Sequence, residues 1–130
     1  MERFLWVCLG GALGSGIRYL VATWAQEKYG LDFPWGTLTV NVTGCFLIGL
    51  VMQLVLTVAD FPPNLRFGLV AGFLGGLTTY SAFAWETAKL ASDGARGVAL
   101  VNFALTTVAG FAAVGLGLTL AKLLVKPAAG

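Results

Sequence analysis

The chain has 130 residues, enough for one domain, and its composition is that of a membrane protein. Hydrophobic residues make up 58% and charged residues 11%, against about 25% charge in ordinary soluble domains. The net charge of +2 provides no strong basic field for nucleic acid, and histidine, the commonest metal ligand and general base, does not occur. We therefore predict one membrane-embedded domain over residues 1–130 that is neither an enzyme nor a nucleic-acid-binding protein.

Four stretches are apolar and long enough to cross a bilayer as helices, which takes about 20 residues. They cover residues 3–24, 35–58, 67–90 and 97–121. Short polar connectors separate them, and Pro34, Pro62 and Pro63 stand where the first two connectors must stop a helix. The predicted fold is an all-α membrane protein with four transmembrane helices.

The third stretch contains a segment that an uninterrupted helix would avoid. Gly75 and Gly76 are adjacent, and Thr78, Thr79 and Ser81 follow, each able to hydrogen-bond backbone groups. We predict that this helix is broken near its middle. Unpaired backbone groups in a bilayer must face protein, water or an ion, and broken spans often hold ion or substrate sites. A kink that only allows close helix packing is the alternative, and the pattern alone does not decide between the two.

Basic residues are balanced between the two ends of the predicted bundle. The end with both termini and the second connector carries Arg3, Arg66, Lys122 and Lys126. The other end carries Lys28, Lys89 and Arg96, and Arg18 in the first span adds a fourth. The positive-inside rule therefore has almost no asymmetry to act on. Insertion in both orientations with antiparallel pairing is one interpretation, and orientation by one or two charges or by the translocation machinery is the other.

Neutral side chains from three spans lie at a similar predicted depth. Asn41 lies about 9 Å inside the second span at 1.5 Å per residue, level with Phe83 and Asn102. Tyr80 shares a helix face with Phe83, and Thr106 shares one with Asn102. Amide donors and the positive edges of aromatic rings can contact an anion that must leave again. A pore for an anion is the functional interpretation, and packing with interhelical hydrogen bonds is the structural one.

Arg18 is a charge inside the first span, where charge is costly and needs a partner. We expect Glu86, near the end of the third span, to pair with it in a structural role, and Lys89 competes for Glu86. Gly10 and Gly14 precede Arg18 at intervals of four residues. This spacing predicts a helix face that another helix approaches closely.

Three stretches of the sequence resemble the Fluc (CrcB) fluoride channels. They are Gly10-Gly11…Gly14…Arg18-Tyr19, Gly36-Thr37-Leu38…Asn41…Gly44, and residues 72–83 (GFLGGLTTYSAF) followed by Glu86. The resemblance covers all four spans in order, and the third-span motif is specific. It implies a passive channel, built as an antiparallel dual-topology homodimer with two narrow pores. Such channels let cytoplasmic fluoride leak out through the microbial plasma or inner membrane and so protect the cell from its toxicity.

The resemblance also implies roles for individual residues. The residues matched to the pore are Asn41, Tyr80, Phe83, Asn102 and Thr106. A sodium ion at the dimer centre would be held by backbone carbonyls of Gly75 and Thr78. The family's first pore phenylalanine is Tyr80 here, which adds a hydroxyl, and the polar track ends at Gly110 where some relatives carry a hydroxyl.

Other functions are weighed against the channel. Some organisms carry paired family genes whose products form heterodimers with one drifted subunit, so an obligate heterodimer subunit or a non-conducting subunit is an alternative. A small dual-topology multidrug exporter is another four-span possibility. Such exporters need a membrane-embedded carboxylate in the first span, where this chain has Arg18 and no acid, which argues strongly against that class.

Overall fold

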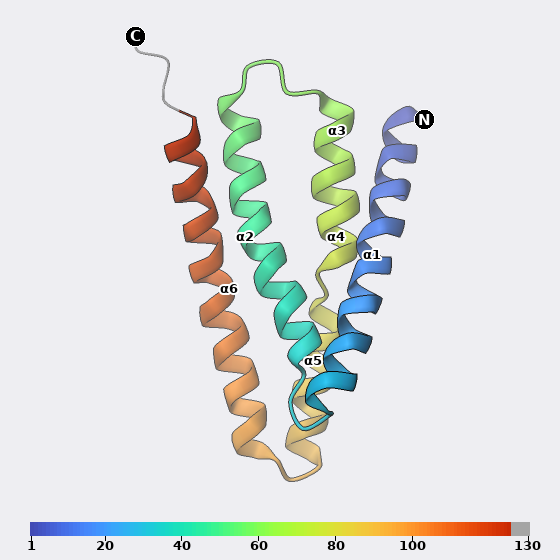
Figure 1. The fold of residues 1–130 in the computed structure, drawn as a ribbon, viewed down its shortest axis with the longest axis vertical. Helices are drawn as coiled ribbons and strands as arrows, with labels where there is room; N and C mark the ends of the chain where they lie inside the picture. Colours follow the sequence, from blue (N-terminus) through green and yellow to red (C-terminus); the bar gives the residue numbers. More distant parts are fainter. Residues whose placement is uncertain (126–130) are drawn as a thin grey trace.

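The structure is a computed structural model that describes residues 1–125, all of whose regular elements are helical (Figure 1). The three unbroken helices are α1 (Glu2–Tyr29), α2 (Trp35–Thr57) and α6 (Arg96–Leu124). Between α2 and α6 lie α3 (Pro63–Phe67), the π-helical segment η1 (Gly68–Leu74), α4 (Gly75–Leu77) and α5 (Tyr80–Ser92). By length and hydropathy, α1, α2, the whole stretch Pro63–Ser92 and α6 can each cross a membrane. The predicted four spans, with the third one broken, are confirmed.

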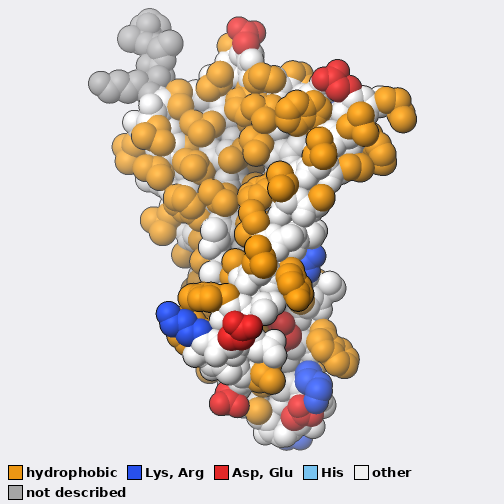
Figure 2. All heavy atoms as spheres, turned by 45° about the vertical axis from the view of Figure 1, so that its right-hand side comes forward, with side chains coloured by type: hydrophobic (Ala, Val, Ile, Leu, Met, Phe, Trp, Pro, Cys, Tyr) orange, Lys and Arg blue, Asp and Glu red, His pale blue; other side chains and the backbone are white. Residues whose placement is uncertain are grey.

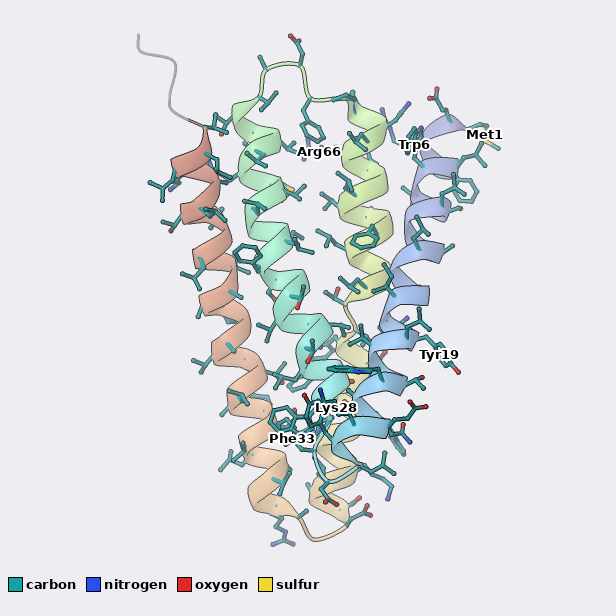
Figure 3. The ribbon with its side chains drawn as sticks, viewed as in Figure 1. Met1, Trp6, Tyr19, Lys28, Phe33 and Arg66 are labelled. Atoms are coloured by element: carbon teal, nitrogen blue, oxygen red, sulfur yellow. The ribbon has the colours of Figure 1, made fainter. Side chains whose placement is uncertain are left out.

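The four spans run alternately up and down. Both chain ends therefore lie at the same end of the bundle as the second connector, and the first and third connectors lie at the other end. In Figure 1 the N-terminus, the end of α6 and the α2–α3 connector lie at the top, and the other two connectors lie at the bottom. Figure 3 accordingly shows Met1 and Arg66 at one end and Lys28 and Phe33 at the other. The basic residues therefore lie at the ends of the bundle predicted for them. Lys126 lies outside the described residues.

The outer surface is suited to lipid. Hydrophobic side chains are densest over the upper half of the face seen in Figure 2, and the charged side chains gather mainly toward its lower end. On α1, large apolar residues such as Leu9, Leu13 and Leu20 are exposed. An apolar surface of this extent on helices of spanning length identifies a multi-pass membrane protein.

Glycines bring α1 against the broken span. A Cβ at Gly10 or Gly14 would overlap the carbonyl oxygen of Gly68 or Phe73, respectively. A Cβ at Gly76 would lie 2.5 Å from a carbonyl oxygen of α1. The close approach predicted from the first-span glycines is confirmed, and it holds η1 and α4 in place beside α1.

The most extensive helix contact joins α2 and α6, and it too depends on glycine. A Cβ at Gly49 would overlap the Val114 carbonyl oxygen, and one at Gly117 would overlap that of Phe46. These two close contacts leave the other end of α2 free to meet the broken span. There Val40 of α2 packs with buried leucines of η1 and α4 in a small core.

Candidate functional site

The third span loses helical geometry at two threonines. Thr78 has φ −84° and ψ 153°, and Thr79 has φ −150° and ψ 112°, so both are extended. The Thr79 hydroxyl then accepts a hydrogen bond from the Ala82 backbone N at 3.2 Å and caps the N-terminus of α5. The break therefore follows the adjacent glycines rather than falling on them, since Gly75 keeps helical angles. Gly76 serves instead to let α1 approach.

Asn41 bridges α2 to the break. Its Oδ1 accepts a hydrogen bond from the Thr79 backbone N at 2.8 Å, and its Nδ2 donates to the Thr79 carbonyl at 3.0 Å. One side-chain amide thus pairs both backbone groups of an extended residue that would otherwise lack partners in the span. The second N–H of Asn41 stays available to a further acceptor. The structural interpretation of Asn41 is confirmed, and it is compatible with the pore interpretation.

The carbonyl oxygens of residues 74–78 differ in whether they accept hydrogen bonds. Leu74 O accepts two hydrogen bonds from Thr78, one from its backbone N at 3.0 Å and one from its hydroxyl at 2.9 Å. Gly76 O accepts a hydrogen bond from Arg18 Nε at 2.9 Å. Among residues 1–125, no group donates a hydrogen bond to the carbonyl oxygens of Gly75 and Thr78. Unpaired carbonyls near the middle of a span require a partner from elsewhere.

A groove of about 510 Å³ lies beside the break, between α2, the third span and α6. The predicted site residues that line it are Asn41, Gly75, Thr78, Tyr80, Phe83 and Thr106. Gly110, where the predicted polar track ends, also lines it. The α5 N-terminus lies at the break, and a helix N-terminus favours negative charge. The groove therefore combines neutral donors, ring edges and a helix N-terminus.

The two aromatic residues of the first turn of α5 differ in exposure. Phe83 is 7% exposed and packs with Tyr80, at 5.8 Å between ring centroids, and with Phe103 at 6.1 Å. Tyr80 is 80% exposed. One copy of the chain thus builds the Phe83 ring into its own core and presents the Tyr80 ring outward.

Asn102 lies in the α5–α6 contact, not in the groove wall. It is 1% exposed, its Nδ2 donates to Thr87 Oγ1 at 2.9 Å, and its Oδ1 accepts from Thr106 Oγ1 at 3.4 Å. Thr87 in turn donates to the Phe83 carbonyl at 2.7 Å. The predicted track of Asn102 and Thr106 is therefore a connected hydrogen-bonded chain that starts at the groove and ends on the backbone of Phe83.

The predicted ion pair between Arg18 and Glu86 is wrong. Arg18 binds a backbone carbonyl of α4, whereas Glu86 Oε1 accepts a hydrogen bond from Thr37 Oγ1 at 2.7 Å. The competing partner, Lys89, pairs instead with Asp93, directly after the end of its own helix. The reason is the break, because α1 packs on the half before it, whereas Glu86 belongs to α5 after it, which packs mainly on α6 and reaches α2 through Thr37. Glu86 Oε2 is buried and accepts no hydrogen bond within the described part of the chain.

Sequence reasoning missed Thr87 as a site residue and assigned no partner to Thr79. Thr87 lies four residues after Phe83, so helical spacing alone places the two on one face. That spacing was the available signal for Thr87. The pairing of Thr79 with Asn41 had no local signal, because it joins residues 38 apart.

Comparison with known proteins identifies the family of the chain. The chain matches the family model described as "CrcB-like protein, Camphor Resistance (CrcB)" over residues 5–118. It is 50% identical over 120 residues to a protein of Anaeromyxobacter dehalogenans named "Fluoride-specific ion channel FluC", covering 92% of this chain and 94% of the relative. It is 44% identical over 124 residues to a protein of the same name from Citrifermentans bemidjiense, covering 95% and 100%. A Sorangium cellulosum protein, also of that name, is 42% identical over 125 residues, covering 96% and 98%. The four-span fold, the broken third span and these matches together show that the chain belongs to the CrcB family.

Proposed function

We propose that the chain is a subunit of a passive fluoride-specific ion channel, not an enzyme, and that it exports cytoplasmic fluoride. The observation that carries the proposal is the neutral groove at the break, supported by relatives named as fluoride-specific channels. Fluoride is small and strongly hydrated, so its water must be replaced by several close donors. The second N–H of Asn41, the Thr106 hydroxyl and the ring edges of Tyr80 and Phe83 are such groups. The groove lining includes no lysine or arginine that would hold the anion in place.

We further propose that two copies assemble as an antiparallel homodimer with two pores. The nearly equal numbers of basic residues at the two ends support insertion in both orientations. The exposed ring of Tyr80 and the exposed Gly75 support a second copy packed over the groove. The test fuses the C-terminus to reporters that are active on only one side of the membrane, a fluorescent protein for the inside and a phosphatase for the outside. Activity of both reporters supports dual topology, and activity of one alone contradicts it.

We also propose that a sodium ion lies at the dimer centre, held by the backbone carbonyls of Gly75 and Thr78. The unpaired carbonyls at the break fit such an ion, and two copies related by an axis at the break would supply four oxygens. Within residues 1–125 no cluster of acidic, cysteine or histidine side chains is arranged to hold a metal. A bound cation would neutralise the carbonyl dipoles where the span lacks backbone pairing. Replacing sodium by a large organic cation is expected to lower the Tm of the purified dimer, and an unchanged Tm would contradict the proposal.

The decisive experiment is ion efflux from liposomes that contain the purified protein alone. A potassium ionophore dissipates the voltage, and chloride serves as the control anion. Fluoride release without chloride release is the expected result. The protein would act in this way in the microbial cell membrane, where a passive leak lowers the cytoplasmic fluoride concentration.

One observation favours a second candidate, a subunit that conducts only in a heterodimer. The resemblance places a phenylalanine at the position of Tyr80, and the added hydroxyl changes the ring that a partner would cover. Absence of fluoride release from well-folded dimers would favour this candidate. The variant Tyr80→Phe then separates the two cases, because restored flux would assign the defect to the hydroxyl alone.

A further inference from the structure

We propose that Thr87, which does not line the groove, is a positioning residue for anion conduction. Thr87 fixes the orientation of the Asn102 side-chain amide. The amide in turn positions the Thr106 hydroxyl so that it can donate a hydrogen bond to an anion in the groove. The inference rests on the proposed channel function and adds to it a residue of α5 that lies about one helical turn after Phe83 and outside the groove lining.

The first step concerns the single hydroxyl proton of Thr87. That proton is donated to the Phe83 carbonyl at 2.7 Å, the usual bond of a helical threonine to the carbonyl four residues earlier. Thr87 Oγ1 can therefore only accept at its other contact, which is Asn102 at 2.9 Å. Asn102 must present its NH₂ group to Thr87 for this bond to form. The orientation of the amide is thus set by Thr87.

The second step follows from the shape of the amide. With Nδ2 turned to Thr87, Oδ1 of Asn102 faces Thr106 and accepts from its hydroxyl. Asn102 is 1% exposed, so water does not compete for these groups. A reversed amide would place an acceptor against the lone pairs of Thr87 and would leave buried groups unpaired.

The third step concerns how loosely the Thr106 proton is held. Five threonines of this structure donate to the carbonyl four residues earlier at 2.7–2.9 Å: Thr39, Thr57, Thr78, Thr87 and Thr119. Thr106 does not do so, and its bond to Asn102 Oδ1 is 3.4 Å long. A bond of this length is weak. Asn102 Oδ1 therefore replaces the backbone carbonyl of the same residue as acceptor of the Thr106 hydroxyl, and it holds that proton only weakly.

The functional consequence is a donor that can be redirected at little cost. Thr106 lines the groove, so an anion there can accept a hydrogen bond from its hydroxyl in place of the long bond to Asn102 Oδ1. The bond between Asn102 and Thr87 stays intact during that exchange. The amide keeps its orientation, and the hydroxyl returns to it when the anion moves on.

The test compares three variants in the fluoride efflux assay, with flux counted per folded dimer. Thr87→Val keeps the shape of the side chain but removes the acceptor for Asn102, and we expect flux about tenfold lower. Thr87→Ser keeps the hydroxyl and should restore most of the flux lost in Thr87→Val. The matched control is Thr119→Val, which loses the same type of bond, 2.8 Å to the Gly115 carbonyl, at an exposed position where no side chain of residues 1–125 bonds the hydroxyl. Its flux should equal that of the wild type.

The flux of these variants decides whether Thr87 positions Asn102 for conduction. Wild-type flux in Thr87→Val, or an equal loss in Thr87→Val and Thr119→Val, overturns the inference, as does failure of Thr87→Ser to exceed Thr87→Val. Absence of flux in the wild type refutes a channel formed by this chain alone, and that result is distinguished from a failure of the Thr87 inference, which requires wild-type flux. If Thr87→Val does not fold as a dimer, Thr87→Cys takes its place. Its thiol is a weak acceptor, so the same reduction is expected, and wild-type flux again overturns the inference.

Discussion

The packing of α1 against the broken span can be tested with the same substitution at two glycines of one helix. An added Cβ at Gly14 would overlap the Phe73 carbonyl oxygen and lie 2.8 Å from the Leu77 backbone N. At Gly16, apart from the adjoining backbone of α1 itself, no atom of residues 1–125 lies within 4 Å of an added Cβ. Alanine is the better helix former by about 1 kcal/mol, and this gain is common to both positions. Overpacking against backbone atoms costs about 1–3 kcal/mol, so Gly14→Ala should be less stable than Gly16→Ala by about that amount.

The assay is thermal unfolding of the purified protein, followed by tryptophan fluorescence. Gly16→Ala is expected to unfold slightly above the wild type, and Gly14→Ala roughly 5–10 °C below Gly16→Ala. Because Gly14 contacts the segment that precedes the break, Gly14→Ala should also lower fluoride flux. Equal Tm values for the two variants would refute the close approach of α1 to η1 and α4. That result would also leave Gly76 of the broken span without a packing role.

Three further predictions concern the break. Asn41→Asp should abolish fluoride flux, because it places negative charge in the path and loses the donor to the Thr79 carbonyl; undiminished efflux would remove Asn41 from the pore. Gly44→Ala should lower the Tm, since the added Cβ would overlap the Thr78 methyl group, and the double variant Gly44→Ala/Thr78→Ser, which lacks that methyl, should recover most of the loss. Thr78→Ala alone should change dimer stability little, because the hydroxyl only adds a second bond to Leu74 O; a collapse of the dimer in size-exclusion chromatography would assign the hydroxyl a larger role.

Several features of this site could be predicted because they depend on local properties of the chain. A run of apolar residues long enough to cross a bilayer is a helix in that solvent whatever its neighbours are. Helical spacing alone places Tyr80 with Phe83 and Thr106 with Asn102. The resemblance to fluoride channels then assigns pore roles to these residues. Of the five assigned to the pore, only Asn102 does not line the groove.

The sequence by itself determined the four apolar spans, the existence of a break in the third, and the glycine face of α1. Tertiary structure alone decided that the break falls at Thr78 and Thr79, where the Asn41 amide from another helix replaces backbone partners. It also decided the partners of Arg18 and Glu86, because the break places Arg18 against the Gly76 carbonyl and Glu86 against Thr37. The physical reason is that helix formation and membrane insertion depend on nearby residues, whereas the partner of a buried polar group depends on which helix faces meet.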